Sequence, residues 1–158
     1  MIATIKQRLK DQKGLTLIEL LAVVVILAII SAIAIPAIGG LIDNTKKDAH
    51  VANAQQMISS AKTWVAGNAN EAIDATNGQK LTLQKMMDDG LIDPIDDPDK
   101  GTYDATASYV LIKKSGKTYS YEVKLTNGTR GIWVDEPKKL KRANVTEPVS
   151  RVATAATT

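Results

Sequence analysis

The side chains of this protein that could do chemistry are mostly carboxylates, because its 158 residues include no cysteine and only one histidine. Aspartates gather between Asp88 and Asp104, in a stretch where Pro94 and Pro98 exclude regular secondary structure. Irregular acidic loops can hold Ca²⁺, which takes about six to eight oxygen ligands. The candidate ligands are Asp93, Asp96, Asp97 and Asp99. Their spacing does not match an EF-hand loop, so a solvated acidic loop is the favoured interpretation and Ca²⁺ is the alternative.

No set of residues for covalent or acid–base catalysis accompanies these carboxylates in the sequence. The single histidine, His50, lies beside an apolar stripe with no triad or ligand partner nearby in the sequence, so we expect it to be a surface or half-buried residue. The glycines do not form a phosphate-binding loop motif. We therefore expect that the protein is not an enzyme and has no cofactor unless the acidic loop holds Ca²⁺.

A separate carboxylate, Glu19, lies within the apolar run from Leu15 to Ile35, whose other polar residues are Thr16 and Ser31. As an α-helix this run is about 31 Å long, enough to cross a bilayer core of about 30 Å. A charged side chain at the centre of a spanning helix costs about 2.5–3.5 kcal/mol on insertion scales. Because such residues usually have a function, Glu19 is the main functional candidate of the N-terminal region.

The net charge of +3 comes entirely from the first 14 residues, which precede the apolar run. The charged residues there are Lys6, Arg8, Lys10, Asp11 and Lys13. By the positive-inside rule this end stays in the cytoplasm and the chain after the apolar run is translocated. Because the remainder carries no net charge, we expect no direct binding of nucleic acid. An ordinary secretory signal peptide is disfavoured, since its apolar region is about 7–15 residues long and uncharged.

The stretch Lys13-Gly14-Leu15-Thr16-Leu17-Ile18-Glu19 resembles the class III signal of type IV pilins and pseudopilins. In that family a basic leader ends in glycine and is followed by an apolar residue, Thr-Leu-Ile-Glu and an apolar helix. The resemblance implies that a prepilin peptidase cleaves between Gly14 and Leu15 and N-methylates Leu15, where the family most often has phenylalanine. It also implies that Glu19 neutralises the Leu15 amine of a neighbouring subunit in a filament. A pair within one subunit is the alternative.

The function that the resemblance implies is that of a structural subunit of a type IV pilus-like filament, or fimbrium. The implied partners are copies of the chain and related pilins, the prepilin peptidase, a membrane platform protein, an assembly ATPase and the bacterial membrane. The precursor would cross the plasma (inner) membrane once, with its N-terminus inside, and the filament would lie at the cell surface. Two alternatives stay open: a pseudopilin of a type II secretion or DNA-uptake (competence) machine, and a single-span membrane-anchored binding protein.

The apolar run is predicted to begin a long helix with two different halves. Residues 15–41 form the transmembrane or filament-core half, and the residues that predict a helix break near its end are Pro36, Gly39 and Gly40. Unwinding of this segment in the assembled filament is a further implication of the resemblance. From Ile42 to about Asn68 the helix is predicted to be amphipathic. Its apolar stripe consists of Val51, Ala54, Ile58, Ala61 and Val65.

The predicted globular head, residues 42–135, combines the amphipathic helix with a short helix and a sheet. Thr82 is expected to cap a helix over Leu83–Asp89. Three strands form an antiparallel meander, with the hairpin signal Asn127-Gly128 before the last strand. They are Ser108–Lys113, Thr118–Leu125 and Arg130–Val134. The predicted fold class is α+β and pilin-like, a long N-terminal helix packed on a three-stranded sheet. Residues 1–14 are the predicted leader, and residues 136–158 are expected to be a flexible tail.

Overall fold

The computed structural model of the protein describes residues 16–68, 73–74 and 77–152. The predicted leader therefore lies outside the described residues, as do Gly14 and Leu15. The chain divides into two compact units, Met1–Ile42 and Asp43–Thr158. Helix α2 (Leu17–Gly67) contributes to both units. The fold class is α+β, as predicted, with a long helix and an antiparallel sheet.

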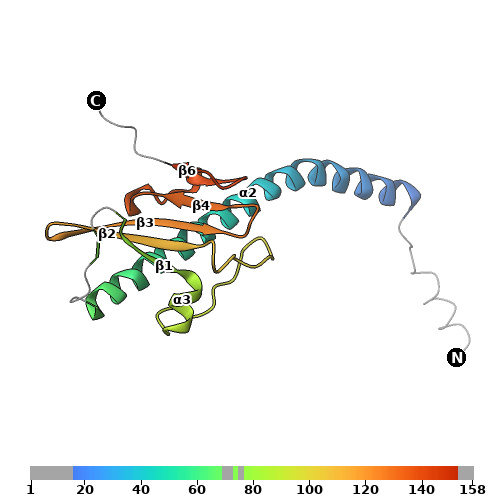
Figure 1. Ribbon diagram of the computed structural model, residues 1–158. Coiled ribbons are helices and arrows are strands. Elements are labelled where there is room, and N and C mark those ends of the chain that lie inside the picture. Colours follow the sequence, from blue (N-terminus) through green and yellow to red (C-terminus); the bar gives the residue numbers. More distant parts are fainter. Residues whose placement is uncertain (1–15, 69–72, 75–76, 153–158) are drawn as a thin grey trace, which may run out of the picture. The chain divides into compact units, whose positions relative to one another are not determined.

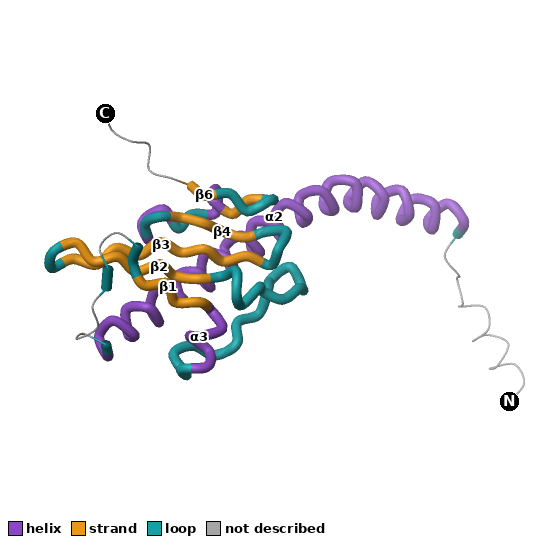
Figure 2. Tube along the Cα trace, in the orientation of Figure 1, coloured by secondary structure: helices purple, strands orange, loops and turns teal. Residues whose placement is uncertain are grey.

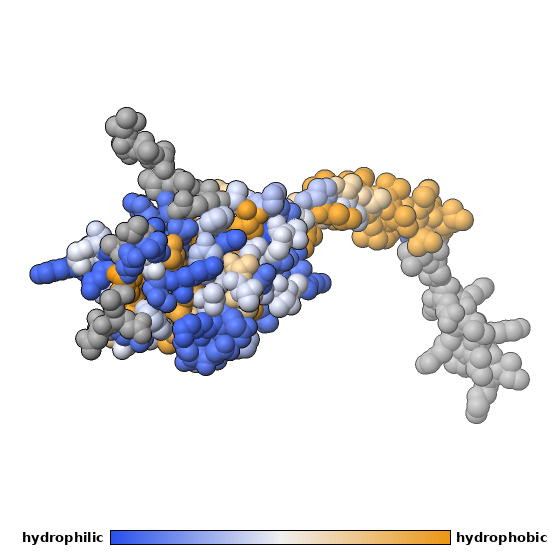
Figure 3. Space-filling model, in the orientation of Figure 1, coloured by the Kyte–Doolittle hydropathy of each residue, from blue (hydrophilic) through white to orange (hydrophobic). Residues whose placement is uncertain are grey.

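In the first unit, the described residues from Leu17 to Ile42 form the apolar half of α2. Large aliphatic side chains are exposed all round this half, from Leu17 at 85% to Ile42 at 52%. Figure 3 shows this surface as mostly orange, with paler patches between the orange areas. The helix is long and apolar enough to cross a membrane. A helix that is apolar on every side is stable in lipid or among other helices, and not in water.

Pro36 lies inside α2, and the helix does not break there or at Gly39 and Gly40. The predicted break is therefore wrong for the single chain. A proline in a helix removes one hydrogen bond, here to the carbonyl of Ala32, and crowds that carbonyl. Glycine lowers helix stability by about 1 kcal/mol relative to alanine. These local losses do not end a helix that has long helical runs on both sides. Unwinding of the segment in a filament stays a prediction.

The second unit is a six-stranded sheet covered on one face by the remaining part of α2, which crosses behind it in Figure 1. The strands are β1 (Gln79–Thr82), β2 (Tyr109–Ser115), β3 (Thr118–Thr126), β4 (Gly131–Val134), β5 (Val145–Thr146) and β6 (Arg151–Val152). The order β1-β2-β3-β4-β5 is antiparallel throughout, and β6 pairs in parallel with the end of β4. Figure 2 shows these strands side by side in orange.

The core of the head forms between alternate strand residues and one stripe of α2, as the period-2 and period-3.6 patterns predict. From the strands it takes Leu81, Val110, Ile112, Val123, Leu125, Ile132 and Val134. From α2 it takes Ala54, Met57, Ile58, Ala61, Trp64 and Val65. The short helix α3 (Leu83–Asp88) adds the buried Met86. Thr82 caps α3 as predicted, since its Oγ1 accepts a hydrogen bond from the Lys85 amide at 3.2 Å.

The sheet is larger than the predicted three-stranded meander, and the tail is more ordered than predicted. β1, β5 and β6 extend the meander at its two sides. The prediction of a flexible tail is wrong as far as Val152, because 3₁₀ turns η1 (Pro137–Lys139) and η2 (Arg142–Asn144) precede the two last strands. Pairing with β4 orders these strands, and Val145 completes the core at 5% exposure. Residues 153–158 lie outside the described residues.

Candidate functional site

Glu19 lies at the third position of α2, and its carboxylate caps the start of the helix. Its Oε2 accepts hydrogen bonds from the Thr16 amide and the Thr16 hydroxyl, both at 2.7 Å. The Thr16 hydroxyl in turn lies 3.3 Å from the Glu19 amide, which donates to it. This reciprocal arrangement is a capping box, in which a threonine before the helix and an acid three residues later satisfy two free backbone amides. The sequence reasoning missed this role, although Thr-x-x-Glu before an apolar run is its signal.

The capping box uses one oxygen of Glu19, Oε2. Among the described residues, nothing is hydrogen-bonded to Glu19 Oε1. Gly14 and Leu15, the predicted cleavage and methylation residues, lie outside the described residues, so the predicted Glu19–amine pair stays a prediction. Glu19 can therefore cap its own helix with Oε2 while Oε1 accepts a further donor.

A second group of functional candidates lies in the head, where α2 brings His50 to the acidic loop. His50 is fully buried, which corrects the prediction of a surface or half-buried residue. Its Nδ1 lies 2.7 Å from the Tyr103 hydroxyl and its Nε2 lies 3.0 Å from Asp99 Oδ2. The partners are about fifty positions away in sequence, so no local pattern of the sequence predicts these contacts. Burial and the nearby Asp97 and Asp99 charges raise the pKa of Tyr103, which keeps its proton.

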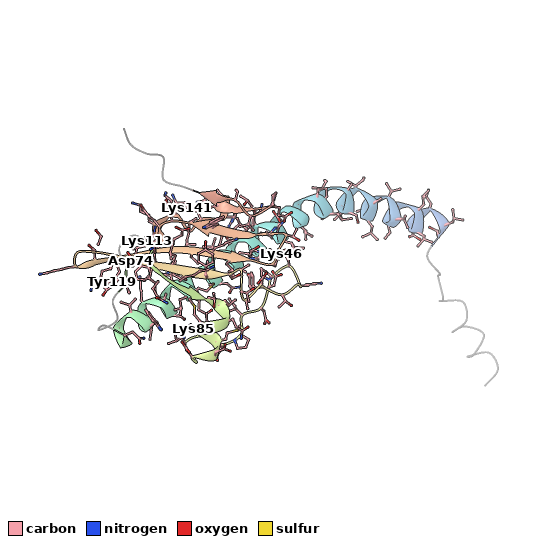
Figure 4. All side chains as sticks on the ribbon, viewed as in Figure 1. Lys46, Asp74, Lys85, Lys113, Tyr119 and Lys141 are labelled. Carbon is pink, nitrogen blue, oxygen red and sulfur yellow. The ribbon has the colours of Figure 1, made fainter. Side chains whose placement is uncertain are left out.

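Asp97 and Asp99 meet His50 in different ways. The Asp97 side chain is fully buried, and its Oδ2 accepts a hydrogen bond from Asn127 Nδ2 at 2.8 Å. Asp99 Oδ1 forms ion pairs with Lys46 at 3.2 Å and Arg130 at 3.3 Å. Burial raises the pKa of Asp99, but the hydrogen bonds from His50 and Lys46 and the Arg130 charge bring it below its usual value. Figure 4 labels Lys46 at the end of the head where this loop runs.

Arg130 joins this group to two further carboxylates. It forms an ion pair with Asp43 at 2.9 Å and a hydrogen-bonded ion pair with Glu147. A cavity of about 300 Å³ opens beside these side chains, with Asp97, Arg130 and Glu147 among its lining residues. The arrangement can hold a small polar ligand or ion, but it contains no nucleophile next to a base among the described residues.

The four predicted Ca²⁺ ligands are not brought together as one set. Asp93 and Asp96 are exposed, whereas Asp97 and Asp99 turn inward to His50. Within the described part of the chain, the group of acidic and histidine side chains close enough to share an ion consists of His50, Asp97 and Asp99. A loop with two prolines has no fixed periodicity, so its sequence could not show which aspartates point inward.

Comparison with known proteins bears on the N-terminal site. Residues 9–35 match the family model described as the prokaryotic N-terminal methylation motif. The chain carries this methylation motif. The match confirms the type IV pilin-like class III signal around Glu19, and the motif points to a structural protein that is anchored in a membrane. Neither the curated proteins nor the solved structures gave a match to the chain. The methylation motif ends at residue 35, before the head.

Proposed function

We propose that the protein is a structural subunit of a type IV pilus-like filament. The observation that carries the proposal is Glu19, a carboxylate with an open oxygen at the start of an exposed apolar helix that bears the methylation motif. Residues 1–14 would be removed by a prepilin peptidase between Gly14 and Leu15. The basic leader would hold the N-terminus of the precursor in the cytoplasm, and the head would be translocated.

The apolar half of α2 supports storage in the membrane followed by packing with other helices. Its aliphatic side chains are exposed along the whole length from Leu17 to Ile42. Lipid covers such a surface before assembly, and copies of the same helix cover it in a filament core. The membrane platform protein and the assembly ATPase are the proposed agents of this transfer.

Glu19 would guide the transfer through its charge. Cleavage creates an amine at Leu15, and in apolar surroundings an amine and a carboxylate attract strongly. The open Oε1 can accept the amine of a neighbouring subunit while Oε2 keeps the capping box. Removal of one partner from a buried ion pair costs about 3–5 kcal/mol, because the other charge is left uncompensated. Assembly should therefore depend on the charge of Glu19 and not on its role as a cap.

The experiment separates these two roles of Glu19. Glu19→Gln keeps an oxygen for the capping box and removes the charge, whereas Thr16→Ala removes the threonine of the box and keeps the charge. Both variants are expected to be inserted and cleaved, as measured by mass spectrometry of the N-terminus. Filaments sheared from cells and seen by electron microscopy should be lost in Glu19→Gln and retained in Thr16→Ala. A normal filament yield from Glu19→Gln would refute the proposed charge pair.

The methylation motif does not distinguish a pilin from a pseudopilin, because it ends before the head. The location of the filament in the cell distinguishes them. Long filaments in the sheared fraction support the pilus subunit. Short filaments that stay with the cell envelope and are needed for secretion or DNA uptake support the pseudopilin. An intact Met1 on the membrane-bound protein, with no filament, supports a single-span anchored binding protein and contradicts the proposal.

A further inference from the structure

Asp97 is a buried carboxylate without a lysine or arginine partner. Its side chain is fully buried, and within the described residues no Lys or Arg nitrogen lies within 4.0 Å of it. The nearest basic group is His50, whose Nε2 lies 3.9 Å from Asp97 Oδ1. Burial of an ionised carboxylate is unfavourable unless a positive charge compensates for it. Neutral donors hold both of its oxygens, the Asp99 amide at 3.0 Å from Oδ1 and Asn127 Nδ2 at 2.8 Å from Oδ2, and a cation bound at Oδ1 would add the positive charge that these donors do not carry.

The hydrogen bonds around Tyr103 fix the orientation of the His50 ring. Asn53 Nδ2 donates to the Asp96 carbonyl at 3.0 Å, which fixes the orientation of the amide, and its second hydrogen is directed at the Tyr103 hydroxyl at 3.1 Å. The Tyr103 hydroxyl also lies 2.7 Å from His50 Nδ1, and a hydroxyl can donate to a ring nitrogen or accept from one. The other ring nitrogen, Nε2, is thereby directed at Asp99 Oδ2, 3.0 Å away, and at Asp97 Oδ1, 3.9 Å away.

The same three side chains direct potential ligand atoms to one point. One nitrogen of His50 and one oxygen each of Asp97 and Asp99 all lie within 4.8 Å of one another. His50 Nε2 lies 3.0 Å from Asp99 Oδ2 and 3.9 Å from Asp97 Oδ1. Ligand atoms at about 2.0–2.2 Å from a tetrahedral Zn²⁺ ion lie about 3.4 Å apart. Since all three atoms lie within 4.8 Å of one another, side-chain shifts of about 1 Å or less would bring them to this spacing.

The other polar atom of each ligand is already held, as in metal sites with an ordered second shell. Tyr103 holds His50 Nδ1, and Asn127 holds Asp97 Oδ2. Lys46 and Arg130 hold Asp99 Oδ1. The cavity of about 300 Å³ beside Asp97 and Asp99 has room for a water molecule as the fourth ligand. Outer contacts of this kind orient ligands and fix the tautomer of a histidine.

We propose that His50, Asp97 and Asp99 form a Zn²⁺ site in the head. A set of one imidazole and two carboxylates suits a divalent transition metal, whereas Ca²⁺ takes oxygen ligands only. With Zn²⁺ bound, Nε2 would coordinate the ion, and the imidazole proton would be on Nδ1 and donate to the Tyr103 oxygen, with the hydroxyl hydrogen of Tyr103 turned away from Nδ1. No electron is transferred, and the ion would add a positive charge beside the buried Asp97. The site ties the helix α2 to the loop after α3.

The test uses the full-length protein without an affinity tag, purified in detergent and stripped of metal, with ZnCl₂ as the probe. His50 is the only histidine and there is no cysteine, so the chain has few competing Zn²⁺ ligands. Isothermal titration should give one site per chain, and the melting temperature should rise with ZnCl₂. A Co²⁺-loaded sample should show the visible absorption of a tetrahedral site. Loss of all three signals would overturn the proposal.

The variants locate the site within the loop. Asp97→Asn should raise the Zn²⁺ dissociation constant by at least about 100-fold. Tyr103→Phe should raise it by about 10- to 100-fold, as loss of other outer contacts does. Asp93→Asn and Asp96→Asn, which change exposed aspartates of the same loop, should leave Zn²⁺ binding unchanged. Circular dichroism establishes whether each variant is folded. If Asp97→Asn is unfolded, Tyr103→Phe still tests the site. Binding that survives Asp97→Asn and Tyr103→Phe, or a response to CaCl₂ alone, would contradict the proposed site.

Discussion

Arg142 donates hydrogen bonds to both carboxylate oxygens of Asp48, from Nε to Oδ1 at 2.8 Å and from Nη2 to Oδ2 at 2.5 Å. The two residues are 94 positions apart and join the turn η2 to the helix α2. These hydrogen bonds lower the pKa of Asp48 and raise that of Arg142. A two-point contact of this geometry explains how a segment with few large apolar residues is ordered in front of β5.

Arg142→Ala is expected to loosen the segment from η1 to β6 while leaving the rest of the head folded. Exposed ion pairs contribute little to global stability, so the unfolding midpoint should change little. Hydrogen exchange at Val145 and Thr146 should become faster, because β5 pairs with β4 over two residues only. Lys141→Ala, at the exposed neighbouring residue, is the control. Equal exchange in the two variants would show that the contact does not order the segment.

Gly131→Ala is expected to be strongly destabilising. A Cβ atom at this buried position would lie 2.0 Å from the Leu125 carbonyl oxygen and 2.9 Å from Thr126 Cα. Both are backbone atoms of the paired strand β3, so neither can move without distorting the sheet. We expect a loss of about 3 kcal/mol or more in the free energy of unfolding, measured by urea denaturation.

Gly67→Ala is the matched control for this substitution. Gly67 is the last residue of α2, and a Cβ atom there would meet no heavy atom within 4 Å. Alanine favours helix over glycine by about 1 kcal/mol, so the variant should be as stable as the unsubstituted protein or slightly more stable. A similar loss in both alanine variants would contradict the steric explanation.

Asp104 is expected to contribute to the acid sensitivity of the head. Its Oδ1 accepts hydrogen bonds from the Ala107 amide at 2.8 Å and from the hydroxyl and amide of Thr106 at 2.7 and 3.0 Å. These bonds hold the pKa of Asp104 below its usual value. A lowered pKa in the folded state means that the stabilisation is present above the unfolded pKa of about 3.9 and is lost as the pH falls through the folded value.

Asp104→Asn keeps an oxygen acceptor in the turn and removes the titration. The urea midpoint of this variant should fall less between about pH 4 and pH 2 than that of the unsubstituted protein. Asp93→Asn, which removes an exposed aspartate without these contacts, controls for the change in net charge. A pH dependence unaltered by Asp104→Asn would show that another group causes the acid sensitivity.

The local patterns of the sequence predicted the elements whose own residues determine them. The apolar stripe of α2, the Thr82 cap of α3 and the hairpin at Asn127-Gly128 all depend on neighbours within one or two turns of chain. β1, β5 and β6 were missed because they have two to four residues each and no clear alternation. They are strands because their neighbours in the sheet, β2 and β4, offer unpaired backbone groups, and this information is not local.

The candidate sites also differ in how much of them the local sequence could predict. Glu19 was found because a carboxylate in an apolar run is conspicuous, but its cap role was overlooked in favour of its charge. The contacts of His50 could not be predicted, since Tyr103 and Asp99 reach it from a loop without periodicity. That loop is held against α2 by tertiary packing, so the direction of each aspartate follows from the fold and not from the spacing along the chain.

The capping box of Thr16 and Glu19 means that α2 contains its own starting signal. The hydrogen bonds of the capping box run between Thr16 and Glu19, which both follow the predicted cleavage point. Proteolysis after Gly14 could therefore change the charge at the N-terminus without any refolding of the helix behind it. Maturation of the subunit would then change only the charge at the start of a helix that is already formed. The same helical surface would contact lipid before cleavage and other subunits after it.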